Sequence, residues 1–402
     1  MSVICKSLKT WFVVGLLCQA KVFSLSSDPL NDLNEFVQIS SGTSDIAGVN
    51  KVLEKTEKEL KELGFETFYN QGPKEMKLDE RRQLVAEWKN ENRPFMTFIA
   101  HADTVFETLT PFKFSDDKKK IFGSGVGDNK GGIVFSLHLF KKLIAHKEFR
   151  YSLRFIVSPT EETGSLGFRE KLSQYAQDSN FIFGMEPALM DGSIVHARKG
   201  VRWYHIKVSG VEAHAGTSYD EGANACLELS QKLNAMFKLS QPQKGNTISI
   251  GHMKGGKEKF NIVCGEAEGK VDFRFVDQKS FDAIHPQILK ILKDPKIKSL
   301  KDGTMTKIEY TFPVEMPPYA LNKRSQKMVD QYLRILSRIE KRNVKSILTG
   351  GGADLNFMAS NDKIMMDGLG PIGGQYHTVN EYIEVDSFST RLQALEEFLT
   401  QI

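Results

Sequence analysis

Five polar clusters in this 402-residue chain come directly after apolar, strand-like stretches or after a glycine-rich loop. Their side chains are mainly carboxylates and imidazoles, which bind divalent metal ions and carry protons in hydrolytic reactions. In an open α/β sheet, ligands bind outside the carboxyl ends of the strands, so residues in these positions can converge on one site. In chain order the clusters are His101-Ala102-Asp103, Asp128, Glu161-Glu162, Glu186-Pro187 and Gln375-Tyr376-His377.

Each cluster taken singly also has a purely structural interpretation. A His-x-Asp pair is often a surface or capping pair, and Glu161-Glu162 suits the start of a helix, where the helix dipole favours negative charge. The glycines of residues 123–127 could suggest a dinucleotide-binding loop, but no buried strand with an acidic residue at the required distance accompanies them. We therefore interpret this stretch as a loop that lets Asp128 approach other groups closely.

The combination of clusters is more specific than any one of them. Two histidines and three carboxylates are the ligand inventory of a dinuclear site for zinc-like ions. Asp103, two residues beyond His101 and on the same side of a strand, suits a carboxylate that orients a metal-binding imidazole. Glu161 then remains as a free carboxylate beside a ligand, which is the position of a general base for metal-activated water.

The elements expected to position these clusters follow an alternating pattern. Helices alternate with short apolar strands up to residue 185, which predicts an α/β domain with a mostly parallel sheet. The expected helices span residues 44–65, 131–143 and 165–175, and the expected strands span 84–88, 94–100, 154–158 and 181–185.

The pattern changes at Lys199-Gly200. Residues 201–312 predict the order strand, helix, strand, strand, helix, strand, which is the ferredoxin-like arrangement. The proline-rich residues 313–318 are interpreted as a linker, after which the first pattern resumes with helices over 323–341 and from 386, and strands over 344–348 and 364–366. We therefore predict one α/β domain, residues 28–198 and 314–402, interrupted by an inserted α+β domain, residues 199–313.

The first 25 residues predict an export signal. Lys6 and Lys9 precede an apolar run over 11–18 that is shorter than the roughly 20 residues needed to span a bilayer. We expect a periplasmic or secreted protein. The alternatives are a buried N-terminal element of a cytoplasmic protein and, less favoured, a lipid anchor at Cys18.

The composition of the chain limits the classes of binding partner that we expect. The chain has 54 Lys and Arg against 50 Asp and Glu, and the basic residues are scattered, so we expect no nucleic-acid partner and no membrane span. Removal of a signal would leave Cys226 and Cys264. Two cysteines in so long a chain predict no disulfide framework and no thiolate metal site, and we expect both to be buried as small hydrophobic side chains.

The clusters together resemble a known superfamily. Their types and order from His101 to His377 are similar to the di-zinc superfamily of acetylornithine deacetylase, succinyl-diaminopimelate desuccinylase, aminoacylase and glutamate carboxypeptidase, and most similar to the glutamate carboxypeptidase branch. The resemblance implies two zinc ions per chain, with cobalt as a substitute. It implies His101 and Glu186 on one ion, Glu162 and His377 on the other, and Asp128 bridging both, with Glu161 as base and Asp103 modulating His101.

The inserted domain carries further similarities. Gly210-Val211-Glu212-Ala213-His214-Ala215-Gly216 resembles the signature of the family's lid and dimerisation domain, whose histidine reaches a neighbouring active site in a homodimer. Asn261 and Arg274 lie where relatives place substrate contacts, and Gly351 lies in a loop resembling the one that forms the substrate carboxylate pocket. Glu315-Met316-Pro317 lacks an arginine that glutamate-preferring relatives carry, which argues against a strict glutamate preference.

The resemblance implies a zinc-dependent carboxypeptidase that cleaves a peptide or amide bond next to a free carboxylate. The alternative enzyme is a deacylase of N-acyl amino acids, which the ligand set does not distinguish because it acts on the same amide. A non-catalytic binding protein is disfavoured, because such a chain would be expected to have lost some of these ligands.

Overall fold

The computed structural model describes residues 25–360 and 362–402, and it confirms the predicted α/β fold class. Among these residues, six strands form the main sheet. Neighbours β6, β3, β7 and β15 run parallel, while β1 and β2 are antiparallel at one edge. The strand order is β1 (Glu66–Gln71), β2 (Arg82–Trp88), β6 (Ser152–Ser158), β3 (Phe95–His101), β7 (Ser179–Gly184) and β15 (Ile364–Met366).

Successive residues of a strand point to opposite sides of the sheet, so the apolar strands of the main sheet present apolar side chains on both faces. Helices cover both of these faces. Phe98 and Phe155 pack against Phe140, with ring centroids 5.1 and 5.3 Å away. Their neighbours Ile99 and Ile156 are buried on the other face. The first face is covered by α1 (Pro29–Val37), α2 (Ile46–Glu62), α3 (Lys130–Ala145), α7 (Lys323–Glu340) and α8 (Val385–Thr400), and the second by α4 (Arg169–Gln177) and the 3₁₀ helix Asp354–Met358.

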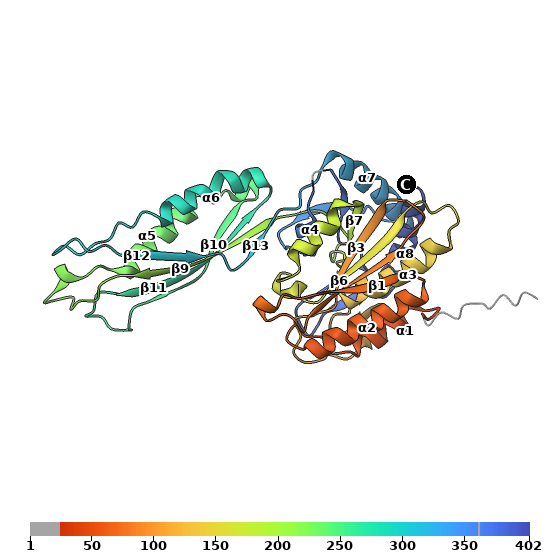
Figure 1. The fold of residues 1–402 in the computed structure, drawn as a ribbon, viewed down its shortest axis with the longest axis horizontal. Helices are drawn as coiled ribbons and strands as arrows, with labels where there is room; N and C mark the ends of the chain where they lie inside the picture. Colours follow the sequence, from red (N-terminus) through yellow and green to blue (C-terminus); the bar gives the residue numbers. More distant parts are fainter. Residues whose placement is uncertain (1–24, 361) are drawn as a thin grey trace, which may run out of the picture.

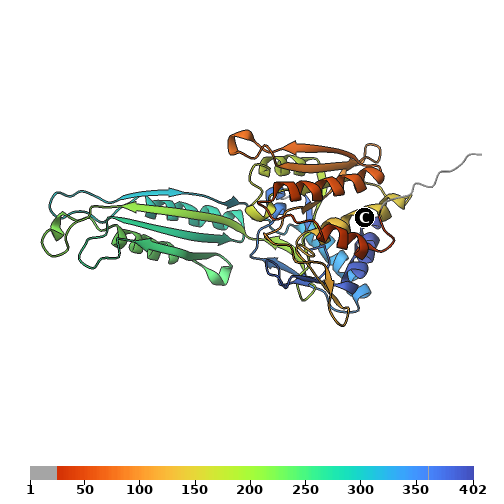
Figure 2. The same cartoon turned by 90° about the horizontal axis from the view of Figure 1, so that it is seen from below.

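A second sheet stands beside the main one (Figures 1 and 2). Its strands run in the spatial order β10-β11-β9-β12, all antiparallel, and its elements follow the predicted sequence order. They are β9 (Gly200–Ser209), α5 (Ala225–Phe237), β10 (Thr247–Gly255), β11 (Glu266–Phe275), α6 (Gln278–Leu292) and β12 (Lys307–Thr311). Helices α5 and α6 pack on one face of this sheet around a hydrophobic core of its own.

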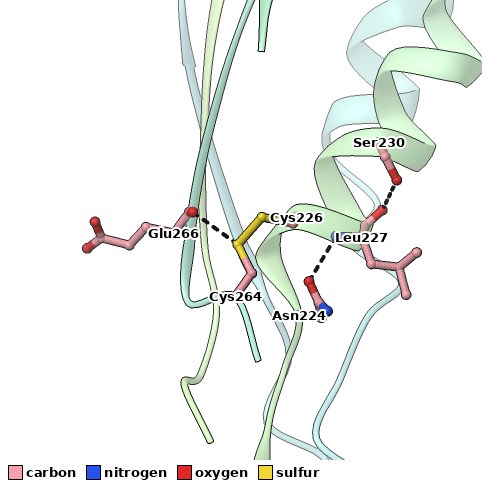
Figure 3. Close-up of a disulfide and its surroundings, with 6 residues drawn as sticks. All are labelled: Asn224, Cys226, Leu227, Ser230, Cys264 and Glu266. Atoms are coloured by element: carbon pink, nitrogen blue, oxygen red, sulfur yellow. Dashed lines mark hydrogen bonds between the residues drawn. A yellow bond between two sulfur atoms is a disulfide. The ribbon is translucent and has the colours of Figure 1, made fainter. Parts of the chain in front are cut away.

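The prediction for the two cysteines was wrong. Cys226, in the first turn of α5, forms a disulfide with Cys264, which lies just before β11 (Figure 3). The backbone N–H of Ala225 donates to the carbonyl of Cys264 at 2.8 Å, so the two segments are also joined by a main-chain hydrogen bond. The residues lie 38 positions apart in sequence, and only the pairing of α5 with the sheet brings them together.

Two further expectations need correction. The proposed linker 313–318 contains a short strand, β13 (Glu315–Met316), which pairs with the start of β9. Helix α4 begins at Arg169 and not at residue 165. The backbone at Gly164, Ser165 and Gly167 has positive φ, which a right-handed helix cannot accommodate.

Two smaller sheets complete the site-bearing domain, and one of them contains the strand that was expected over residues 344–348. Strand β8 (Ile194–Arg198) pairs in parallel with β14 (Ser346–Thr349). Strands β4 (Lys113–Phe114), β5 (Lys120–Phe122), β17 (Tyr382–Glu384) and β16 (Gly373–Gly374) form a sheet in the order β16-β17-β5-β4. This small sheet brings the segment before Asp128 next to the segment after His377.

The predicted export signal and the alternative lipid anchor at Cys18 lie, except for Leu25, outside the described residues. None of the helices in the described part of the chain combines the length and apolar character needed to cross a bilayer.

Candidate metal centre

The main sheet positions three of the five clusters. His101 is the last residue of β3, Glu161 and Glu162 lie in a 3₁₀ turn after β6, and Glu186 lies two residues beyond β7. Strands β6, β3 and β7 are adjacent and parallel, so their carboxyl ends meet at one edge of the sheet. The geometry at this edge follows directly from the parallel pairing.

Two loops add the remaining groups. Asp128 follows the glycine loop after β5, and His377 lies in the turn between β16 and β17. Nε2 of His101 lies 2.9 Å from Oδ1 of Asp128 and 3.6 Å from Oε1 of Glu186. Nε2 of His377 lies 3.3 Å from Oδ2 of Asp128 and 3.3 Å from Oε2 of Glu162. The two oxygens of Asp128 therefore face two different histidines.

These residues form two groups that could each hold a metal ion. One group is His101, Asp128 and Glu186, and the other is Asp128, Glu162 and His377. Within each group the potential ligand atoms all lie within 4.8 Å of one another. Asp128 belongs to both groups, so the arrangement has the form of a dinuclear centre with one shared carboxylate.

Asp103 lies behind the candidate ligands and fixes their positions through hydrogen bonds. Its Oδ1 accepts the backbone N–H of Glu161 at 3.0 Å, and its Oδ2 accepts the N–H of Glu162 at 3.3 Å and the hydroxyl of Thr43 at 2.9 Å. Nδ1 of His101 lies 2.9 Å from the backbone oxygen of Asp103 and 3.4 Å from its Oδ1. With its proton on Nδ1, His101 keeps the lone pair on Nε2 for a cation.

The electrostatics of the cluster favour cations. Burial raises the pKa of Glu186 to about 8 and that of Glu161 well above its usual range, and neighbouring carboxylates add to both shifts. Hydrogen bonds to Asp128 and Glu162 raise the pKa of His377 to about 10. The buried Oε1 of Glu162 has no hydrogen-bond partner within the described residues. Divalent ions with a preference for nitrogen and oxygen donors fit this excess of acceptors.

A cavity of about 240 Å³ opens beside the two groups and is lined in part by Glu161, Arg198 and Tyr376. The Arg198 guanidinium pairs with Asp367 at 2.6 Å, and its Nη1 donates to the carbonyl of Gly351 at 3.2 Å. Arg274 of β11 donates from Nη1 to the carbonyl of Gly350 at 3.1 Å. The loop of residues 350–352 is thus held between Arg198 at the end of β8 and Arg274 of β11, next to the cavity.

His214 and Asn261 are not at this site within one chain. Strand β9 runs away from the main sheet, so residues 210–223 lie at the far end of the second sheet (Figures 1 and 2). Nδ1 of the exposed His214 accepts the backbone N–H groups of Gly216 and Thr217, each at 3.1 Å. Asn261 lies beside it, with Nδ2 3.5 Å from Nε2 of His214. The structure brings these two residues to each other.

Sequence reasoning missed three residues near the site. Arg198 ends an unpredicted strand, and Asp354 and Glu381 were assigned no role. Buried Asp354 accepts a hydrogen bond from the Ser165 hydroxyl. For Arg198, the available signal was its position at the end of an apolar stretch just before the change of pattern at Lys199. For Glu381, the available signal was its position four residues beyond His377.

The fold and the donor set together define a metal-dependent hydrolase. Residues 97–401 match the model of the family described as Peptidase family M20/M25/M40. The match covers more than half of the chain, and the chain therefore belongs to this family of metallopeptidases, in agreement with the resemblance found in the sequence. It is a hydrolytic enzyme.

Individual relatives are distant but span most of the chain. The chain is 25% identical to carboxypeptidase G2 of Pseudomonas sp. (strain RS-16), over 96% of this chain and 94% of that protein. It is 22% identical to succinyl-diaminopimelate desuccinylase of Beijerinckia indica, over 94% and 98% of the two chains. The crystal structure of aminopeptidase PepT from Bacillus cereus has the same fold, with a TM-score of 0.75 at 21% identity over 93% and 97% of the two chains.

Proposed function

We propose that this protein is a zinc-dependent carboxypeptidase that cleaves a peptide or amide bond next to a free carboxylate on a small substrate. The observation that carries the proposal is the pair of donor groups that share Asp128, with Glu161 beside them in the same cavity. His101 and Glu186 would hold one zinc ion, Glu162 and His377 the other, and Asp128 both. Cobalt would be a substitute with a similar affinity for nitrogen and oxygen donors.

The two cations, when bound, supply a water of lowered pKa and polarise the scissile carbonyl. Glu161 takes the proton of the attacking water and returns it to the leaving amine. Its backbone is fixed by the hydrogen bond to Asp103, and its carboxylate lines the cavity.

The two arginines beside the loop of residues 350–352 support recognition of a carboxylate. Arg198 lines the cavity, and a guanidinium can hold a carboxylate through two parallel hydrogen bonds. Arg274 lies on the other side of the same loop, at Gly350. The similarity to a carboxypeptidase over almost the whole chain points in the same direction.

The alternative function is removal of an acyl group from an N-acyl amino acid, and the similarity to a desuccinylase favours it. Matched substrates separate the two functions. The purified, zinc-loaded protein should hydrolyse dipeptides and glutamate conjugates faster than N-acetyl and N-succinyl amino acids. The same dipeptides with an amidated C-terminus are the control. Equal turnover of free and amidated forms would refute recognition of a free carboxylate, and faster turnover of the acyl amino acids would favour the deacylase.

The role of Glu161 can be tested separately. Glu161→Gln should reduce kcat by about 10²–10⁴-fold, the usual contribution of a general base. Because the side chain of Glu161 belongs to neither donor group, the variant should retain the metal content of the wild type in elemental analysis. A variant that keeps its activity would contradict the assignment, and a variant that loses metal in proportion to activity would make Glu161 a ligand.

We also propose that two chains pair through the second domain, so that His214 and Asn261 of one chain contribute to the cavity of the other. Both residues are exposed and close together, neither lines the cavity, and the segment 210–223 that carries His214 lies at the far end of the second sheet. Mixing inactive His214→Ala and Glu161→Gln chains tests this, because a mixed dimer contains one complete site. Recovery of activity on mixing is the expected result, and its absence in dimers shown to exchange subunits would refute the proposal.

Export of the protein is proposed on the N-terminal sequence and on the disulfide. Disulfides persist in oxidising compartments such as the periplasm or the extracellular space and are rare in the cytosol. Fractionation of cells that express the full chain, with detection of the shortened mature protein, tests the proposal. Full-length protein in the cytosolic fraction alone would refute it.

A further inference from the structure

A buried carboxylate that has no part in the proposed chemistry joins the two loops of the candidate metal centre. Glu381 has only 1% of its surface exposed and lies directly before β17. Its Oε1 accepts the backbone N–H of Gly127 at 2.8 Å and that of Asp128 at 2.9 Å. Its Oε2 accepts the N–H of Gly125 at 3.2 Å. One side chain therefore satisfies three backbone donors of the loop that ends in Asp128.

The backbone of Glu381 belongs to the other loop. Its N–H donates to the carbonyl of Thr378 at 3.1 Å, and the N–H of Thr378 donates to that of Gln375 at 3.2 Å. These bonds close the turn that carries His377. The carbonyl of Glu381 also accepts the N–H of Gly123 at 3.4 Å, which extends the pairing of β5 with β17. Main chain and side chain together clamp the His377 turn to the Asp128 loop.

We propose that Glu381 is a positioning residue that fixes Asp128 relative to His377 and thereby selectively strengthens binding of the cation held by Asp128, Glu162 and His377. The inference rests on the two-cation site of the proposed function. Two of the three ligands of that cation, Asp128 and His377, lie in the loops that Glu381 joins, whereas the other cation has only Asp128 in these loops.

The effect is selective because the other ligands depend on different elements. His101 and Glu186 are held by β3 and β7, which pair along most of their length in the main sheet. They do not need the contact between the two loops to stay in place. His377, with 56% of its side chain exposed, lies in a short turn, and Glu381 closes that turn against the Asp128 loop.

The Asp128 loop needs this support. Gly125 has a φ of +71° and Gly127 packs so closely that a Cβ there would lie 3.0 Å from the Tyr376 ring. Without Glu381, these three N–H donors would lose their acceptor, and because an unsatisfied buried donor is costly, the loop would shift to find other partners. Groups that hold metal ligands from behind typically change metal affinity by about 10–100-fold when they are removed.

The experiment measures zinc bound to the protein at a series of buffered free zinc concentrations. Wild type, Glu381→Ala, Glu381→Gln and Glu384→Ala are compared by elemental analysis after equilibrium dialysis. Glu384 is the matched control, because it lies in the same strand β17 and its side chain makes none of these hydrogen bonds. Circular dichroism and thermal unfolding of the metal-free proteins establish that each variant folds.

In Glu381→Ala, one of the two zinc sites should need about 10–100-fold more free zinc to be half occupied than in wild type. The free zinc concentration that half-fills the other site should change less than about threefold. Glu381→Gln should fall between wild type and Glu381→Ala, because its Oε1 can still accept from Gly127 and Asp128 while its amide cannot accept from Gly125. Glu384→Ala should match wild type.

The possible outcomes separate this inference from the proposed function. If both Glu381 variants bind two ions as wild type does, or if both ions weaken equally, the positioning role is refuted. Should Glu381→Ala fail to fold, a Gln variant identical to wild type would refute it as well. If wild type itself binds fewer than two ions, the two-cation site of the proposed function is wrong.

Discussion

Asp103 offers a sharp test of how the candidate site is built, because its carboxylate accepts at both oxygens. Oδ1 faces the N–H of Glu161, and Oδ2 faces the N–H of Glu162 and the Thr43 hydroxyl. In Asp103→Asn an amide NH₂ replaces one oxygen. Whichever way the amide is oriented, the NH₂ meets the backbone N–H of one of the two glutamates and loses that hydrogen bond.

The magnitude follows from these contacts. One hydrogen bond to a charged acceptor is worth about 1.5–3 kcal/mol, so Asp103→Asn should lower the free energy of unfolding by about that amount. The loss displaces the turn that carries Glu161 and Glu162 and weakens the orientation of His101. Metal affinity or kcat should therefore fall by about 10–100-fold, as for other carboxylates behind metal ligands.

The assay combines urea unfolding of the metal-free protein, zinc binding at buffered free zinc, and kcat on the best dipeptide substrate. Thr43→Val is the matched control, since it removes the hydroxyl donor but leaves both backbone N–H groups paired with Asp103. It should cost about 1 kcal/mol and change kcat less than threefold. Wild-type kcat and zinc affinity in Asp103→Asn, or equal damage by Thr43→Val, would refute the reasoning.

Three other predictions follow from single contacts. Replacing Cys226 and Cys264 by Ser should lower the unfolding free energy of the second domain by about 4 kcal/mol, the loop-entropy value for a cross-link of this span; unchanged calorimetric unfolding would contradict it. Arg198→Lys keeps the charge but loses the planar fork, so KM for free-carboxylate substrates should rise about tenfold with little change for amidated ones, and an equal rise for both would remove Arg198 from carboxylate binding. Burial lowers the pKa of His285 to about 4, and its Nδ1 lies 2.6 Å from the Tyr204 hydroxyl. The folded state therefore favours neutral imidazole, so this contribution to stability is full above about pH 6.5 and is lost as the pH falls toward 4. The melting temperature of His285→Gln should therefore fall less on acidification than that of wild type, and parallel curves would disprove the linkage.

Much of the fold was predictable because its signals are local. Apolar runs such as 154–158 and 181–185 mark buried strands, and the alternation of strands with helices implies a parallel sheet whatever the tertiary details. The ends of elements were less predictable. The positive φ of Ser165, for example, delays the start of α4, and this conformation goes with a hydrogen bond to Asp354, far away in the sequence.

The sequence by itself determined which residues could form a metal centre, because side-chain type and position after a strand are local properties. His101, Glu162 and Glu186 converge once β3, β6 and β7 pair in parallel. Only the tertiary structure decided the rest. Three kinds of contact join segments that are far apart in the chain. They are the disulfide between Cys226 and Cys264, the hydrogen bond from Arg198 to Gly351, and the three hydrogen bonds accepted by Glu381. Such contacts depend on how loops pack after the sheets have formed, and no local pattern of residues records them.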